Sequence, residues 1–244
     1  MKTAKTAGII IIGNEILSGK VQDINSFYLA SELRGLGVDV QRITVIPDDT
    51  VVIGQEAVRF SGKYDYVFTS GGVGPTHDDV TMAGIARGFQ VSLKQDSKIT
   101  NLFSARYGST MNQSVLKMAM VPEGSTVEFH DSMKFPIVSF RNIYIFPGIP
   151  EYMQNKFSMI REKFRTSAFH LKRLYLNCHE SVIAGALNAI VEKYGDVTIG
   201  SYPVLGMADF QVIVTAETKC EESLRQALDD LVQTFPENCL IKVE

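Results

Sequence analysis

The sequence predicts an α/β protein with two domains, and three observations carry this prediction. Apolar segments alternate with helical segments up to about residue 165. The first of these segments, Gly8 to Ile12, is a continuous β-branched run, typical of a strand buried on both faces of a parallel sheet. From about residue 168 the order becomes strand, helix, strand, strand, helix, strand. We therefore expect a mostly parallel sheet over 1–167 and a ferredoxin-like βαββαβ domain over 168–244.

Within the first domain, strands are expected at 8–12, 38–46 and 64–70, with helices between them. Asp23 is expected to cap the first helix, which ends at Gly35 or Gly37. Later in the chain, residues 136–146 predict a strand pair that turns at Arg141 and Asn142, and a closing helix follows. In the second domain, the predicted elements are 170–178, 180–195, 197–204, 209–217, 220–235 and 239–244.

Composition excludes several classes of partner. The 24 basic and 27 acidic residues give a formal charge of −3, and no Lys/Arg block indicates nucleic-acid binding. The apolar run that ends at Ile12 is too short for a signal-peptide core or a membrane span. Cys178, Cys220 and Cys239 lack metal-ligand spacing, and their odd number predicts reduced thiols in a cytoplasmic protein.

The stretch TSGGVGPTHDDVT, residues 69–81, predicts an anion-binding loop. It follows the third predicted strand, at the sheet edge where open parallel sheets bind ligands. Gly71, Gly72 and Gly74 permit close approach of backbone amides, and the next helix adds its positive dipole end. The spacing matches neither a Walker A loop nor a Rossmann fingerprint. The alternative is a glycine-rich turn in which Asp78 or Asp79 caps the following helix.

Three other loops are expected to reach the same edge: GNEILSG, PDD and FPGIP. With the glycine-rich loop they bring Glu15, Asp48, Asp78 and Asp79 near the proposed phosphate site. Bare carboxylates would repel a phosphate, so a bridging divalent cation is expected, namely magnesium, manganese or cobalt. The alternative for one residue of the Asp48–Asp49 pair is helix capping. For Glu15 the alternative is hydrogen bonding to backbone amides in a buried turn.

These four loops resemble the signature loops of the molybdopterin-binding (MoaB/Mog) fold over about Ala7 to Phe164. More narrowly, GPTHDD and FPGIPEYM are similar to the CinA N-terminal domain and to the N-terminal, molybdopterin-binding-like domain of eukaryotic-type FAD synthase. In the latter group the segment GSYPV also has a counterpart. The resemblance implies a three-layer α/β/α first domain and a homo-oligomer, either a dimer or a trimer.

Carried over by position, the resemblance implies roles for individual residues. Asp79 and Asp48 would be catalytic, and together with Asp78 they would hold the metal. Asn14 stands where the family often has aspartate, which weakens a metal-ligand role for that position. The ligand would be bound by Gly13, Asn14, Glu15, Ser70, Gly71, Gly72, Val73, Gly74, Pro75, Thr76, Pro147 and Gly148.

The resemblance implies three functions. The first is metal-dependent hydrolysis of a nucleotide pyrophosphate, such as FAD (to FMN and AMP) or ADP-ribose. The second is binding of molybdopterin or its adenylate in molybdenum cofactor synthesis, with the same acids holding magnesium. The third is nucleotide or flavin binding without turnover, in regulation of FAD synthase. Because no PAPS reductase-like domain follows within the 244 residues, adenylation of FMN is not expected.

Overall fold

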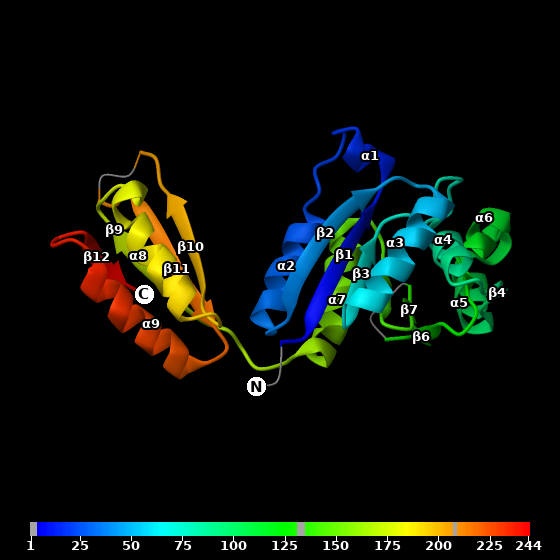
Figure 1. Ribbon diagram of the computed structural model, residues 1–244. Coiled ribbons are helices and arrows are strands. Elements are labelled where there is room, and N and C mark those ends of the chain that lie inside the picture. Colours follow the sequence, from blue (N-terminus) through cyan, green and yellow to red (C-terminus); the bar gives the residue numbers. More distant parts are fainter. Residues whose placement is uncertain (1–3, 131–134, 207–208) are drawn as a thin grey trace. The chain divides into compact units, whose positions relative to one another are not determined.

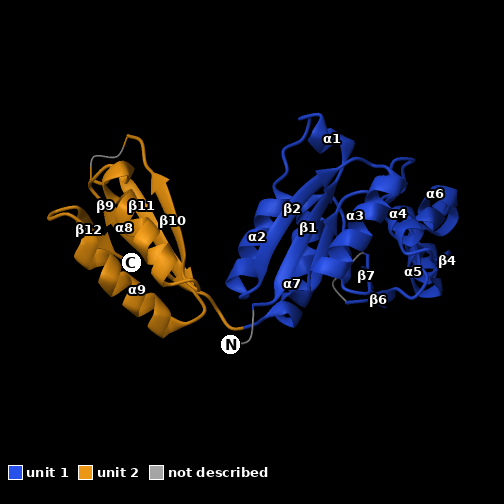
Figure 2. Ribbon diagram, in the orientation of Figure 1, with its two compact units in different colours: residues 1–166 blue, residues 167–244 orange. Residues whose placement is uncertain are grey.

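In a computed structural model of the chain, residues 4–130, 135–206 and 209–244 are described. The chain forms two compact units, residues 1–166 and 167–244 (Figure 2). Each unit contains its own sheet and its own buried core. Each is therefore described by itself.

A six-stranded sheet organises the first unit, in the order β2-β1-β3-β8-β7-β6; β2, β1, β3, β7 and β6 are labelled in Figure 1. Its parallel strands are β1 (Thr6–Ile12), β2 (Asp39–Ile46), β3 (Tyr66–Ser70) and β8 (Ile143–Phe146). The antiparallel strands at one side are β7 (Ile137–Phe140) and β6 (Thr126–Glu128). The predicted mostly parallel sheet is confirmed, with the β7–β8 pair turning at Arg141 and Asn142.

Helices cover both faces of this sheet, and strand β1 shows why. Ile9 and Ile11 belong to one buried cluster, whereas Ile10 and Ile12 belong to the other. Successive side chains on a strand point to opposite faces, so the unbroken apolar run reflects burial on both sides. The first cluster is closed by α2 (Asn25–Gly35) and α7 (Pro150–Ile160), the second by α3 (Thr50–Lys63) and α4 (Thr81–Gly88). The three-layer α/β/α arrangement is confirmed.

Between α4 and β6 the chain forms small elements that the sequence analysis leaves unassigned. The strands β4 (Leu93–Gln95) and β5 (Met120–Pro122) pair with each other. Among the helices, α5 (Ser97–Tyr107) and α6 (Gln113–Lys117) add Ile99, Phe103 and Val115 to the core. The remaining short helices are α1 (Asn14–Leu17), η1 (Gly108–Thr110) and η2 (Arg161–Phe164). No helix in the described ranges has the length and apolar content needed to span a bilayer.

Two aspartates stabilise helix starts as expected. Asp49 is the N-cap of α3, and its carboxylate accepts from the backbone N–H groups of Val51 and Val52. Asp23 Oδ1 accepts from the first two N–H groups of α2. Asp49 is therefore the capping member of the Asp48–Asp49 pair, and Asp48 is available for another role.

The alternative in which Asp78 or Asp79 caps α4 is wrong. The helix begins at Thr81, and its N-cap, Val80, makes no side-chain cap. Both aspartates instead turn back toward Thr76, whose hydroxyl lies 2.6 Å from a carboxylate oxygen of each. Aspartate readily bonds to groups two or three residues away, and here this local turn outcompetes the helix terminus.

The second unit has the predicted βαββαβ order: β9 (His170–Leu176), α8 (Glu180–Lys193), β10 (Thr198–Pro203), β11 (Val212–Thr218), α9 (Glu221–Thr234) and β12 (Leu240–Val243). Its antiparallel sheet has the order β10-β11-β9-β12. Leu174, Val214, Ile183 and Leu231 lie in a core between the sheet and the two helices. The strand order is that of a ferredoxin-like fold.

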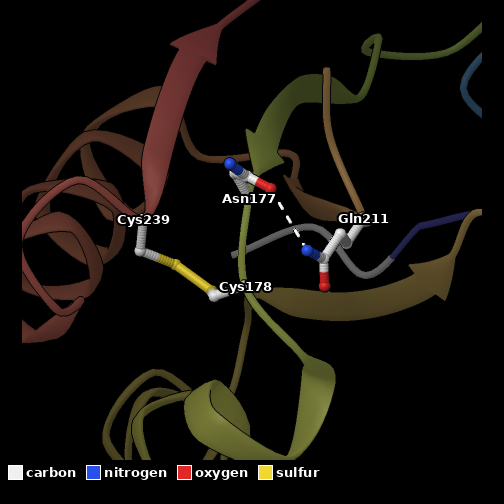
Figure 3. Close-up of a disulfide and its surroundings, with 4 residues drawn as sticks. All are labelled: Asn177, Cys178, Gln211 and Cys239. Carbon is white, nitrogen blue, oxygen red and sulfur yellow. Dashed lines mark hydrogen bonds between the residues drawn. A yellow bond between two sulfur atoms is a disulfide. The ribbon is translucent and has the colours of Figure 1, made fainter. Parts of the chain in front are cut away.

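A disulfide joins Cys178 and Cys239 in this unit (Figure 3). The expectation of three reduced thiols is therefore wrong for two of them, and Cys220 is the free cysteine. The two cysteines are 61 residues apart, so their spacing in the sequence does not predict a disulfide. The adjacent strands β9 and β12 bring their Cα atoms to 5.5 Å from each other. The neighbouring Asn177 N–H donates to the Cys239 carbonyl at 2.7 Å, and its side-chain oxygen accepts from Gln211.

Candidate ligand-binding and active site

The loop that follows β3 has a backbone that favours glycine. Gly71 has φ 111° and Gly72 has φ 63°. A Cβ on Gly71 would lie 2.0 Å from the Ile12 carbonyl oxygen, and one on Gly72 would lie 2.4 Å from Thr81 Oγ1. Thr81 also donates its hydroxyl to the Gly71 carbonyl at 2.8 Å. The glycine-rich loop, residues 70–76, is thus packed closely between the end of β1 and the start of α4.

This loop presents backbone donors that the protein does not use. The Gly71 N–H donates to the Phe146 carbonyl at 3.1 Å and so continues the β3–β8 pairing. Within the described part of the chain, the N–H groups of Gly72, Val73 and Gly74 have no protein acceptor. Successive free amides on such a backbone form a concave site for an anion. The anion-binding interpretation therefore has three specific donors.

A buried polar network joins the glycine-rich loop to the loop after β8. Ser70 is 1% exposed, and its hydroxyl donates to the Pro147 carbonyl at 3.1 Å. Asn25, the first residue of α2, donates its amide to Ser70 Oγ at 2.9 Å and to the Gly148 carbonyl at 2.7 Å. Asn25 is absent from the residues predicted for the site, because its burial, which requires a hydrogen-bonded polar side chain, is known only from the structure. Two of the predicted site loops are fixed together by this side chain.

A cleft of about 1000 Å³ opens beside the loop, large enough for a dinucleotide. Its walls include the predicted residues Glu15, Gly71, Gly72, Val73, Gly74, Pro75, Asp79, Pro147 and Gly148. Its other walls are mostly apolar: Val21, Met82, Ile99, Phe103, Met118, Phe135, Pro136, Val138, Ile145, Ile149, Pro150, Tyr152, Asn155, Lys156 and Met159. The remaining predicted residues are outside the lining: Gly13, Asn14, Asp48, Ser70, Thr76 and Asp78.

Asp48 is the carboxylate most affected by its surroundings. Its Oδ2 accepts from the Asn14 N–H at 2.8 Å. Burial raises the pKa of Asp48, and the negative charges of Glu15, Asp78 and Asp79 raise it further, against the lowering effect of the Asn14 hydrogen bond. Glu15, Asp78 and Asp79 are therefore each near enough to Asp48 to interact with it electrostatically.

Asp79 and Asp78 are positioned by Thr76. Asp79 Oδ2 accepts from the Thr76 N–H at 2.8 Å as well as from its hydroxyl. The hydroxyl of Thr76 also lowers the pKa of Asp78. Lys117 from α6 donates to the Thr76 carbonyl and holds this turn from the other side. Asp79 is the member of the pair that lines the cleft.

The donors beside the cleft are suited to a hard cation. In the described residues, no group of three or more His, Cys, Asp and Glu side chains is arranged to hold a metal ion. The available donors are carboxylate oxygens, and burial, followed by the neighbouring negative charges, raises the pKa of Asp48. Magnesium binds through one or two carboxylates and completes its coordination with water and phosphate oxygens. The residues therefore fit a cation that binds together with a phosphate ligand.

Lys156 is a second site residue that is absent from those predicted for the site. It lies on α7, is half-buried, and lines the cleft. Its ammonium donates to the Pro136 carbonyl, and burial lowers its pKa to about 8. The residue follows buried Met153 by three positions and precedes buried Ile160 by four, which places it at the margin of the apolar helix face. That spacing indicates a lysine beside the buried face of the helix, but it does not indicate the cleft.

Comparison with known families covers both units. Residues 8–165 match the family described as the probable molybdopterin binding domain. The chain belongs to this family. Residues 168–244 match the middle domain of FAD synthase, and this second match corresponds to the ferredoxin-like unit.

Individual relatives extend the same result. A probable FAD synthase of Caenorhabditis elegans is 32% identical over 259 residues, covering 95% of this chain and 50% of the relative. A protein of Archaeoglobus fulgidus is 36% identical over 220 residues, covering 90% of this chain and 93% of the relative. The chain thus spans about half the length of the nematode FAD synthases that it matches.

Among solved structures, the protein CinA from Thermoplasma acidophilum, described as having unknown function, is 28% identical with a TM-score of 0.61. The match covers 66% of this chain and 100% of that one. The resemblance to the MoaB/Mog fold, to CinA and to FAD synthase is confirmed by these relatives.

Proposed function

We propose that the chain is a divalent-metal-dependent hydrolase of nucleotide pyrophosphates, with FAD or ADP-ribose as the substrate class. The observation that carries this proposal is the set of unused N–H groups of Gly72, Val73 and Gly74 beside the carboxylates of Asp79 and Asp48. An anion site next to crowded acids suits a phosphate that arrives with a cation. In the proposed reaction, water attacks one phosphorus of the P–O–P bridge, whose bond to the other phosphate breaks. FAD gives FMN and AMP.

The chain's own residues supply binding, orientation and proton transfer. The loop amides bind oxygens of the pyrophosphate, and the apolar walls of the cleft pack against a planar ring and exclude water. Asp48, where it is not itself a ligand of the cation, would accept the proton that the attacking water loses. Thr76 holds Asp79 in place at the mouth of the loop.

One or two of the carboxylates of Asp79, Asp48 and Asp78 would hold the cation, which we expect to be magnesium, manganese or cobalt, with water and phosphate oxygens completing its coordination. When bound, the cation would offset phosphate charge and acidify water. The negative charges that raise the pKa of Asp48 would then be partly neutralised. This proposal explains why four acids can remain beside an anion site.

The test is incubation with FAD, ADP-ribose and NAD under each of the three metals, with products resolved by chromatography. We expect metal-dependent formation of FMN and AMP from FAD, and a chelator should stop it. Asp79→Asn should abolish turnover. Asp39→Asn is the matched control, because Asp39 lies at the start of β2, whereas the predicted site loops follow the ends of the parallel strands. Absence of cleavage of every substrate with every metal would refute the proposal.

A second candidate is binding of molybdopterin or a nucleotide without hydrolysis, in molybdenum cofactor synthesis or in regulation of FAD synthase. The observation that favours it is the family match itself, to a probable molybdopterin binding domain and to the middle domain of FAD synthase. Tight binding of FAD with metal and without product over hours would support the regulatory function. Tight binding of a pterin phosphate, with no binding of FAD, would support the molybdenum cofactor function.

A further inference from the structure

The cleft contains one partly buried ammonium group, that of Lys156, and its surroundings do not compensate for its burial. Lys156 is the sole basic residue among the described residues that line the cleft. Its ammonium donates to a neutral backbone carbonyl, that of Pro136, and no carboxylate in the described residues pairs with it. An ammonium carries three donors, so one neutral acceptor leaves most of its hydrogen-bonding capacity unused.

A partly buried ammonium with so little compensation is unfavourable for the unliganded protein. Near it, Phe103, Phe135 and Met159 line an apolar wall of the same cleft. An apolar wall with one cation is complementary to a ligand that combines a ring with an anionic group. A nucleotide has this combination.

We propose that Lys156 is a ligand-binding residue whose ammonium contacts a phosphate oxygen of the nucleotide while the ring packs on the apolar wall. This rests on the proposed function, since it takes a nucleotide pyrophosphate as the ligand of the cleft. It assigns to α7 a direct part in recognition, in addition to the loops at the ends of the strands. It also predicts that binding is coupled to proton uptake.

The proton coupling follows from the environment of Lys156. The other titratable groups that line the cleft are Glu15, Asp79 and Tyr152, and the shift of the Lys156 pKa comes from burial rather than from any of these charges. With a pKa of about 8, roughly half of the lysine is neutral at pH 8. A bound phosphate favours the charged form, so about half a proton should be taken up per ligand at that pH.

The experiment is calorimetric titration at pH 8 with saturating magnesium, in two buffers that differ in ionisation enthalpy. The ligand is ADP-ribose with a methylene group in place of the bridging oxygen, which cannot be hydrolysed at that position. Its phosphates do not titrate near pH 8, so the buffer dependence reports protons taken up by the protein. Wild type is compared with Lys156→Met, Lys156→Arg and Lys98→Met, the last removing an exposed lysine of α5 next to the cleft.

We expect Lys156→Met to weaken binding by about 10- to 100-fold, the usual effect of losing a charge-assisted hydrogen bond. Lys156→Arg should retain affinity within about threefold and lose the proton uptake, because arginine stays charged. Lys98→Met should behave as wild type. Equal affinity of wild type and Lys156→Met, or proton uptake that persists in Lys156→Arg, overturns the inference.

The outcomes also separate this inference from the proposed function. Ligand binding that depends on Lys156, together with no cleavage of FAD under any metal, supports the inference and contradicts the hydrolase. Cleavage that is unaffected by Lys156→Met supports the hydrolase and overturns the inference. Failure of the wild-type protein to bind the ligand overturns both.

Discussion

Asp48 accepts a hydrogen bond of 2.8 Å from the backbone N–H of Asn14. This contact connects the loop after β2 to the loop after β1. Asp49, the next residue, caps α3 instead. Two adjacent aspartates therefore have different structural roles, and substitutions should separate them.

For Asp48→Asn we expect loss of hydrolysis by about 100-fold or more, since a positioned proton acceptor contributes that much. Stability should not fall. The pKa of Asp48 is raised in the folded state, so its contribution to stability is present at acid pH and is lost as pH rises through the folded pKa. Removing the charge should therefore raise the melting temperature at pH 7 relative to wild type, and the difference should shrink toward pH 4. Thermal melts at both pH values without metal test this, and a variant clearly less stable than wild type at pH 7 would contradict it.

Asp49→Ala, in contrast to Asp48→Asn, should lower stability and leave hydrolysis nearly unchanged. Loss of the two hydrogen bonds to the N–H groups of Val51 and Val52 should lower the free energy of unfolding. Turnover should remain within about threefold of wild type at a temperature where the variant is folded. Urea denaturation and the FAD assay measure the two quantities. A stable but inactive Asp49→Ala protein would mean that the roles of the pair are reversed.

Gly72→Ala should disturb the anion site through the backbone. The new methyl group would lie 2.4 Å from Thr81 Oγ1 at a φ of 63°, so loop and helix start must shift. We expect a loss of about 1–3 kcal/mol in stability and weaker nucleotide binding. Gly62→Ala is the control, because Gly62 lies exposed in α3 and its added Cβ would meet nothing within 4 Å. That control should be neutral or stabilising by up to about 1 kcal/mol, and equal effects of the two substitutions would contradict the packing argument.

Lys156→Met should stabilise the unliganded protein at neutral pH by about 1–3 kcal/mol, given a pKa lowered from 10.5 to about 8. Between these two values the unfolded chain binds more protons than the folded one, so wild-type stability rises with pH there. The advantage of the variant should accordingly shrink as pH rises from about 8 toward about 10. Urea denaturation across that range measures it. A variant less stable than wild type at pH 7 would indicate a structural role for the ammonium.

Reduction of the Cys178–Cys239 disulfide should destabilise the second unit by about 2–4 kcal/mol, because its loop spans 61 residues. Calorimetric melts with and without reductant should show the change in the transition of residues 167–244 and leave that of residues 1–166 in place. Cys178→Ser should reproduce the effect of reductant, and Cys220→Ser should not. Identical melts under both conditions would mean that the bond does not contribute to stability.

The two-domain order and the sheet could be predicted because their signals are periodic and local. The run Ile9 to Ile12 supplies both clusters of the first unit, and an amphipathic strand would have shown alternation instead. The unusual backbone of the glycine-rich loop could also be predicted, because Gly71 and Gly72 adopt conformations that other residues avoid.

The rest of the site depends on distant contacts. Asn25 donates a hydrogen bond to Ser70, which lies 45 residues further along the sequence, and no local sequence pattern around either residue predicts this contact. Lys156 becomes a site residue only because the cleft passes along α7. The capping error at Asp78 and Asp79 has a different origin. Thr76 and the helix terminus are both within reach, and sequence spacing does not decide between two local partners.

Because Asn25 hydrogen-bonds to both site loops, the first turn of helix α2 should respond to ligand binding. No residue of α2 lines the cleft, yet its first side chain contacts both Ser70 and the Gly148 carbonyl, which belong to the two loops that do. Any tightening of those loops around a ligand is therefore transmitted to the first turn of a helix that the ligand never touches. Slower amide hydrogen exchange in that turn would register occupancy from outside the cleft, independently of what the ligand is and of whether it is cleaved.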